Sequence, residues 1–169
     1  MAPDRRCEFE SQLLRLLDTY GRALHRLCAV YLQDAADQQD LYQEIAAALW
    51  SALPNFRGDS SERTWLYRVA HNVAYTYANK RRRQYHAEQQ MDALVGDPSV
   101  PEDPRRSVLL EAIRYLDSVD RQVVLLYLEG LSAREIEDVT GLSANSVNVR
   151  LSRTRRKMAS IVVGKEVGE

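Results

Sequence analysis

The sequence predicts an all-α protein made of two small helical domains joined by a flexible linker. Apolar residues recur at three- and four-residue intervals, the period of an amphipathic helix, and the two-residue alternation of a strand does not occur. A proline-rich, acidic stretch at 96–104 interrupts this pattern and disfavours regular structure. We therefore expect a first domain at 1–83, a linker at 84–106 and a second domain at 107–163 that contains a helix-turn-helix.

The first domain is predicted to contain three helices. The first spans roughly 9–32 by its apolar spacing. A second begins at Asp37, a plausible N-cap, and ends at Pro54, which cannot continue a helix. The segment that follows has turn composition, and Ser60 or Ser61 can cap a third helix that runs into a basic segment.

The second domain is predicted to open with two helices, at 108–116 and 119–128. Ser118 is the expected N-cap of the second, and Gly130 closes it, because glycine readily adopts the left-handed conformation found at helix ends. Ser132-Ala133-Arg134-Glu135 then has the S-x-x-E spacing of a capping box, which indicates the start of a short helix.

Residues 132–153 have the features of a helix-turn-helix. The short helix ends near Gly141, which supplies the backbone conformation of a tight turn, and Ser143 caps a longer helix through Met158. We expect the two helices to pack through Ile136, Val139, Leu142, Val147 and Leu151. The cap, the glycine, the apolar spacing and the basic charge coincide, which favours DNA binding over a plain helical hairpin with a solvated basic tail.

The polar side chains of the last helix divide into two groups. Small polar residues at a helix N-terminus can approach base edges, and we assign this role to Asn145, Ser146 and Asn148. Basic residues further along can hold phosphates and fix the docking; these are Arg150, Arg153, Arg155, Arg156 and Lys157. Base reading and backbone anchoring are therefore predicted to be separate.

The charge of the chain is local rather than global. The formal net charge is -1, which argues against indiscriminate coating of nucleic acid. Residues 63–83 and 150–157 nevertheless contain basic side chains and no acid. Two basic segments on an otherwise acidic chain predict two places that meet nucleic acid.

Composition indicates a soluble globular chain, and the N-terminal residues and short apolar runs lead us to expect a cytoplasmic protein. Apolar residues make up 45% of the chain and charged residues 28%. The first residues carry acids where a signal peptide has an apolar core, and apolar runs are too short to span a membrane. Cys7 and Cys28 form no CxxC pair, so we expect reduced thiols and neither a disulfide framework nor a metal site.

The second domain resembles region 4 of extracytoplasmic-function (ECF) sigma factors over the segment YLDSVDRQVVLLYLEGLSAREIEDVTGLSANSVNVRLSRTRRKM. This resemblance implies that the domain binds the minus-35 promoter element in duplex DNA and touches the flap of the polymerase β subunit. It makes Asn145, Ser146, Asn148 and Arg150 the best candidates for contact with the minus-35 element.

The first domain resembles sigma region 2, with three motifs in the family's order. Asp40-Leu41-Tyr42-Gln43-Glu44 is similar to D-L-x-Q-E, Phe56-Arg57-Gly58 to F-R-G, and residues 64–72 to W-L-x-R-I-A-x-N. The resemblance implies that the first motif docks on the clamp helices of the polymerase β′ subunit. The implied contact residues are Asp40, Leu41, Gln43 and Glu44.

The other two motifs imply a site that captures unstacked bases of the minus-10 element, which asks for aromatic faces, cations and polar groups. We expect Trp65 to lie in the core rather than to serve as a base platform. Thr76 stands where the family commonly has Asp. The predicted minus-10 contacts are Arg57, Gly58, Asp59, Ser60, Ser61, Arg63, Asn72, Lys80, Arg81, Arg82 and Arg83.

These observations together predict a sigma factor that directs core RNA polymerase to promoters and assists their melting. The alternatives are a stand-alone regulator whose helix-turn-helix binds an operator, and an adaptor that makes protein contacts only. An enzyme is not expected, because the three histidines are scattered and no phosphate loop, metal-ligand spacing or nucleophile motif occurs. We expect no cofactor. The expected partners are core polymerase, promoter DNA and an anti-sigma factor, with no stable homo-oligomer.

Overall fold

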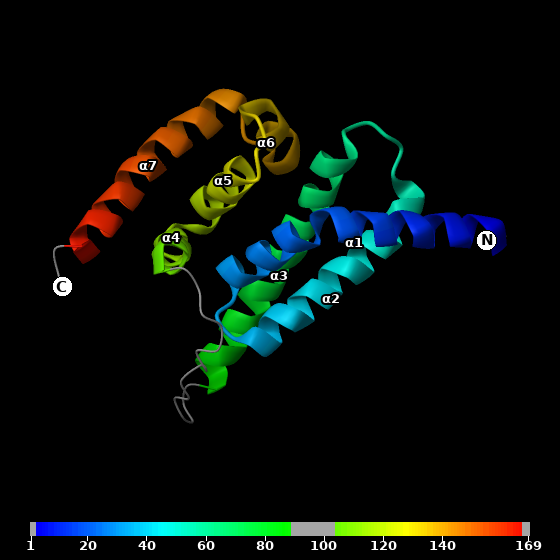
Figure 1. Ribbon diagram of the computed structural model, residues 1–169, viewed down its shortest axis with the longest axis horizontal. Coiled ribbons are helices and arrows are strands. Elements are labelled where there is room, and N and C mark those ends of the chain that lie inside the picture. The colour runs from blue at the N-terminus through cyan, green and yellow to red at the C-terminus, as the bar shows by residue number, and fades with distance from the viewer. Residues whose placement is uncertain (1–2, 89–103, 167–169) are drawn as a thin grey trace. The chain divides into compact units, whose positions relative to one another are not determined.

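The computed structural model describes residues 3–88 and 104–166, and every regular element in these ranges is a helix (Figure 1). The chain divides into two compact units, Met1–Asp97 and Pro98–Glu169. The predicted all-α class is confirmed. The helices of the described ranges include none that is both long and apolar enough to cross a membrane. The elements are α1 (Pro3–Tyr31), α2 (Ala35–Ala52), the 3₁₀ helix η1 (Leu53–Asn55), α3 (Glu62–Glu88), α4 (Pro104–Arg114), α5 (Ser118–Leu128), α6 (Ala133–Thr140) and α7 (Ala144–Glu166).

The linker predicted at 84–106 stays a prediction, because most of it lies outside the described part of the chain. α3 continues to Glu88 and α4 begins at Pro104, while residues 89–103 lie outside the described part of the chain. α3 can continue because arginine, glutamine, alanine and glutamate all favour helix. Proline suits the first helical position, because its missing N–H would have no partner there.

The first unit is a three-helix bundle in which α1, α2 and α3 pack against one another (Figure 1). Each helix contributes one apolar stripe at three- and four-residue spacing. The side chains with no exposed surface include Leu16, Leu24, Leu41, Ile45, Leu49 and Leu66. Arg15 on α1 also donates two hydrogen bonds, of 2.9 and 2.6 Å, to the carboxylate of Glu62 at the start of α3. The bundle therefore holds α2 and α3 in a fixed register.

The caps of α2 and α3 show which polar residues hold the turns. Ser61 caps α3 as predicted, because its Oγ accepts the backbone N–H of Thr64 at 3.1 Å. The N-cap of α2 is Asp34 rather than Asp37; Asp34 Oδ1 accepts the N–H of Asp37 at 2.9 Å. Asp37 lies in the first helical turn with its side chain turned inward and 4% exposed. A local pattern of possible caps does not reveal which aspartate has a partner inside the bundle.

The second unit repeats this arrangement at α5. Asp117, not the predicted Ser118, is the N-cap, and its carboxylate accepts the N–H groups of Val119 and Asp120. Aspartate and serine both cap well, and here the earlier residue has the extended backbone that a cap requires. Gly130 closes the helix as predicted, with φ of 82°.

The helix-turn-helix of α6 and α7 follows the sequence prediction closely. The capping box of Ser132 and Glu135 is present. Gly141 ends α6 with φ of 74°, and the Oγ of Ser143 accepts the N–H of Ser146 at the start of α7. Of the residues predicted to pack these helices, Leu142 is half-buried and the others are buried, namely Ile136, Val139, Val147 and Leu151.

His71 on α3 is a buried titratable group inside the first unit. It is 2% exposed, and its Nδ1 lies 3.3 Å from the hydroxyl of Tyr31 on α1. Burial lowers the pKa of His71 from 6.5 to about 3, because the charged imidazolium would lose its hydration. The unfolded chain therefore binds a proton that the folded chain excludes, and stability is lost as the pH falls from about 6.5 toward 3.

We predict that His71→Phe flattens this pH dependence. Between about pH 7 and about pH 5.5 the wild type should lose roughly 1 kcal/mol of unfolding free energy through this one group, whereas the variant should lose much less. Urea denaturation at the two pH values measures the difference. His25→Gln removes an exposed histidine that stacks on Tyr42 and is the control for the loss of a histidine from the first unit. An equal loss in His71→Phe and wild type would contradict the prediction.

Candidate nucleic-acid and partner interfaces

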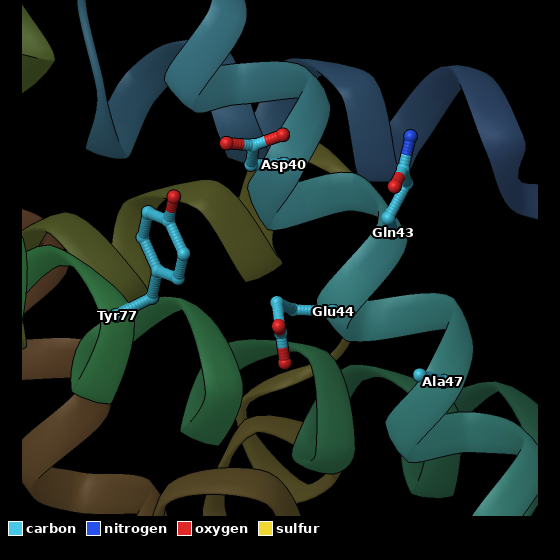
Figure 2. A pocket seen from close by; sticks show the side chains of 5 residues that line it. All are labelled: Asp40, Gln43, Glu44, Ala47 and Tyr77. Atoms are coloured by element: carbon cyan, nitrogen blue, oxygen red, sulfur yellow. The ribbon is translucent and has the colours of Figure 1, made fainter.

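One face of α2 forms a shallow pocket with a single residue of α3. Asp40, Gln43, Glu44 and Ala47 lie at three- and four-residue intervals along α2, and Tyr77 reaches toward them from α3 (Figure 2). Asp40, Gln43 and Glu44 are exposed. The structure thus brings together three of the four residues predicted to dock on a partner.

Leu41, the fourth of these residues, does not belong to this surface. Its side chain has no exposed area and packs in the core of the bundle. Adjacent positions on a helix point about 100° apart, so Leu41 faces inward when Asp40 faces outward. Leu41 therefore offers no side-chain surface to a partner in this structure, and it packs α2 against the bundle.

The pocket has negative electrostatic character. Burial, followed by the charges of Asp37 and Asp40, raises the pKa of the Tyr77 hydroxyl above its ordinary value. Asp37 itself is bound by Arg81 of α3, whose Nε lies 2.8 Å from its Oδ1. A surface with two exposed carboxylates and a phenol that stays protonated suits a partner with basic side chains.

The loop between η1 and α3 presents Arg57, Gly58 and Asp59 to solvent. Gly58 has φ of 78°, a conformation that favours glycine, so the loop depends on it. Phe56 and Trp65 close the base of the loop, with ring centroids 4.9 Å apart. Trp65 is half-buried in this contact.

The remaining predicted loop residues are less free. Ser60 and Arg63 are half-buried. The hydroxyl of Ser61 caps α3 and lies 2.8 Å from the Oγ1 of Thr64. Ser61 therefore holds the end of the loop, and the exposed charged groups of the predicted capture loop are those of Arg57 and Asp59.

An exposed polar face runs along α3 from Asn72 to Arg83. Its exposed members are Asn72, Tyr75, Thr76, Lys80, Arg82 and Arg83. Tyr75 is 51% exposed and lies one turn from Asn72, so its ring is available for stacking, whereas Tyr77 faces α2. Arg81 also faces α2 through Asp37 and is not part of this face. Helical period alone could have separated these two groups.

The first turns of α7 carry the residues predicted to read bases. Asn145 and Asn148 are exposed, and Val149 beside them is 60% exposed. The hydroxyl of Ser146 instead lies 2.9 Å from that of Ser143, within the cap of α7. Sequence reasoning missed Val149 because an apolar side chain is ordinarily assigned to a core, although one turn of helix places it on the face of Asn145.

The basic residues of α7 fall into two classes. Arg150 and Arg153 each bind the buried carboxylate of Asp120 on α5, at 2.6 and 2.7 Å. Arg155 donates to the hydroxyl of Tyr127 at 2.7 Å, with its guanidinium 5.0 Å from the ring centroid. Arg156 and Lys157 are exposed and form no ion pair with any other residue whose side chain is described.

The charge state of Asp120 follows from these contacts. Burial opposes the ionised carboxyl, but the hydrogen bonds from Arg150 and Arg153 outweigh it and hold the pKa of Asp120 below its ordinary value. Asp120 is therefore an anion between two cations at neutral pH. Both oxygens of the carboxylate are occupied by α7.

Comparison with known proteins identifies both units. The family model for sigma-70 region 2 matches residues 16–84, and the model for sigma-70 region 4 matches residues 106–158. The ECF RNA polymerase sigma-E factor of Haemophilus influenzae is 30% identical, over 70% of this chain and 71% of its own length. ECF RNA polymerase sigma factor SigG of Mycobacterium tuberculosis is 30% identical over 95% of this chain, which spans about 50% of SigG.

The fold is also similar to that of a solved structure. The sigma factor RpoE of Bartonella quintana, crystallised with the anti-sigma factor NepR, superposes with a TM-score of 0.72 at 20% sequence identity. The match covers 92% of this chain and 96% of RpoE. At this identity the likeness concerns the fold.

Proposed function

The chain belongs to the ECF group of sigma-70 RNA polymerase sigma factors, and from this we propose that it directs core polymerase to promoters and assists promoter melting. One observation carries the proposal. Regions 2 and 4 occur in order in one chain, and each unit presents an exposed polar or cationic helix face. An operator-binding regulator needs only the second of these faces. The sigma assignment accounts for both.

The polymerase contact is assigned to the pocket face of α2. Asp40, Gln43 and Glu44 are exposed and aligned, and the acidic character of the pocket suits basic groups on the β′ clamp helices. The first unit would thus dock through α2 and leave the exposed face of α3 free.

The minus-10 contacts are assigned to the loop before α3 and to the exposed face of α3. Arg57, Gly58 and Asp59 would line the capture loop, Tyr75 would stack on an unpaired base, and Asn72 would meet a base edge. Lys80, Arg82 and Arg83 supply phosphate contacts further along the same helix. No bond is made or broken by the protein in this scheme, because the chemistry belongs to the polymerase.

The minus-35 contacts are assigned to α7. Asn145 and Asn148 can donate to and accept from adenine, and Val149 can contact a thymine methyl group. Arg156 and Lys157 are free to hold phosphates, and Arg155 can do so from its place over Tyr127.

Further partners follow from the same assignment. The β flap is proposed as the second polymerase contact of the region 4 unit. RpoE of Bartonella quintana was crystallised with an anti-sigma factor, and we propose that an anti-sigma factor also controls this chain by masking its polymerase and DNA surfaces. With polymerase and an anti-sigma factor as its partners, the protein would work in the cytoplasm as a monomer that joins polymerase.

We predict that the Gln43→Ala, Glu44→Ala double variant loses promoter-directed transcription. The change removes two exposed polar groups from the docking face, so core polymerase should no longer recruit the protein. Run-off transcription on fragmented genomic DNA, with purified core polymerase, measures the discrete start sites that the wild type creates.

Gln39→Ala is the matched control, because Gln39 is exposed on α2 outside the pocket, and it should transcribe like the wild type. If the wild type yields no transcripts and does not co-purify with core polymerase, the operator-binding regulator becomes the better assignment.

We predict that Arg156→Gln with Lys157→Gln lowers the salt dependence of duplex binding. Each phosphate contact contributes about 0.9 to the slope of log K against log salt concentration, so the slope should fall by about 2. Fluorescence anisotropy across a salt series measures it. Arg6→Gln with Arg22→Gln removes the same charge from exposed positions of α1 and should leave the slope unchanged. If the slope fell equally in both variants, the change in net charge alone would explain it, and the predicted phosphate contacts of Arg156 and Lys157 would be contradicted.

We predict that Val149 senses a thymine methyl group. The selected minus-35 duplex is one that carries the minus-35 element of a promoter found by the run-off transcription. For the wild type, replacing thymine by deoxyuridine in this duplex should weaken binding several-fold, because only methyl groups are removed. In Val149→Ser the same replacement should change binding little. A wild type that binds both duplexes equally would remove Val149 from the base-reading face.

A further inference from the structure

Asp120 is a fully buried carboxylate whose two oxygens are both bound by α7. It lies in the first turn of α5, where its own N–H is bound by the cap Asp117 at 2.9 Å. Arg150 Nη1 approaches Oδ1 at 2.6 Å and Arg153 Nη2 approaches Oδ2 at 2.7 Å. The side chain of Asp120 has no exposed surface, whereas those of Arg150 and Arg153 are 30% and 52% exposed.

The arginines are therefore accessible to solvent but are anchored at one end. Arg150 and Arg153 are three residues apart, so they project from the same side of α7 toward α5. If either arginine moved to a DNA phosphate, the buried carboxylate of Asp120 would keep only one of its two partners, which costs free energy because a buried charge needs compensation. The geometry favours the internal pair over the phosphate.

The pair also fixes the rotation of α7 about its own axis. Two bonds from one turn of α7 to one carboxylate allow little roll of that helix. Asn145 lies five residues before Arg150, and Val149 lies four residues before Arg153, so the same contact sets the direction of both side chains. Arg155 over Tyr127 adds a second α5 contact one turn later.

We propose that Asp120 is a specificity-determining positioning residue, which withholds Arg150 and Arg153 from the DNA backbone while it orients the base-reading face of α7. The proposal rests on the proposed function, because it requires α7 to enter duplex DNA. Its consequence is that neutralising Asp120 should strengthen binding to arbitrary DNA. The two released arginines become phosphate contacts that carry no sequence information.

The test compares Asp120→Asn with Asp117→Asn in the full-length protein. Both variants remove one negative charge from the N-terminal end of α5, at the cap or in the first turn, and asparagine at position 117 still caps the helix. The probe is a duplex of scrambled sequence, and the readout is the slope of log K against log salt. For Asp120→Asn the slope should steepen by about 2, since each new phosphate contact adds about 0.9. Asp117→Asn should match the wild type.

A purely structural role for Asp120 would lower stability without adding phosphate contacts. If Asp120→Asn is folded by circular dichroism and its slope equals that of the wild type, the proposal is overturned. The ratio of affinities for the selected minus-35 duplex and the scrambled duplex should also fall in Asp120→Asn. An unchanged ratio would count against the positioning role.

A second variant keeps the proposal testable if Asp120→Asn does not fold. This triple variant combines Asp120→Asn, Arg150→Gln and Arg153→Gln. Amides replace all three charged groups in it, so no buried charge is left unpaired. Its slope should equal that of the wild type, because the arginines it lacks make no phosphate contact in the wild type. A slope lower by about 2 would show that they do, and would overturn the proposal. Failure of the wild type to bind any duplex would instead contradict the proposed function.

Discussion

Each unit is organised around a buried aspartate that binds arginine from the helix assigned to DNA. In the first unit Asp34 caps α2 and Asp37, three residues later, binds Arg81 of α3. In the second Asp117 caps α5 and Asp120, again three residues later, binds Arg150 and Arg153 of α7. The first aspartate of each pair satisfies backbone N–H groups and the second fixes a neighbouring helix. The orientation of both DNA-facing helices depends on this arrangement.

Two magnitudes explain why these partly exposed arginines keep their aspartate partners. Removing one partner of a fully buried ion pair costs about 3–5 kcal/mol, and solvent screening lowers this cost where the arginine is partly exposed. One phosphate contact at physiological salt is worth on the order of 1 kcal/mol, given the slope per phosphate. We therefore expect the internal partner to be preferred, and a basic run in the sequence to contain both structural cations and cations that we propose to face DNA. On α3 the second kind comprises Lys80, Arg82 and Arg83, and on α7 it comprises Arg156 and Lys157.

Local signals predict most of this fold, and partners distant in sequence decide the rest. Apolar period, the capping box at Ser132 and the glycine at 141 are local, and the structure confirms them. The partners of Arg81 and Arg150 lie 44 and 30 residues away, which no local pattern reveals. The same limit explains the misplaced caps. Asp34 and Asp37 have equal capping chemistry, and only the contact with α3 shows that Asp37 is the inward one.

The helical period predicts which residues of the site face solvent and which face the bundle. The motif assigns Leu41 to a surface, and charge assigns Arg81 to one, although their positions on α2 and α3 place them toward the bundle.

A small number of free cations helps a promoter-binding subunit to discriminate between DNA sequences. Its affinity for non-specific DNA rises with each phosphate contact, whereas the free-energy penalty for a wrong base pair does not. With two weak units in one chain, binding of the first raises the local concentration of the second. Neither unit then needs a fully exposed basic helix. In the proposed scheme the aspartates that bind arginine, Asp37 and Asp120, support discrimination between DNA sequences as well as the fold.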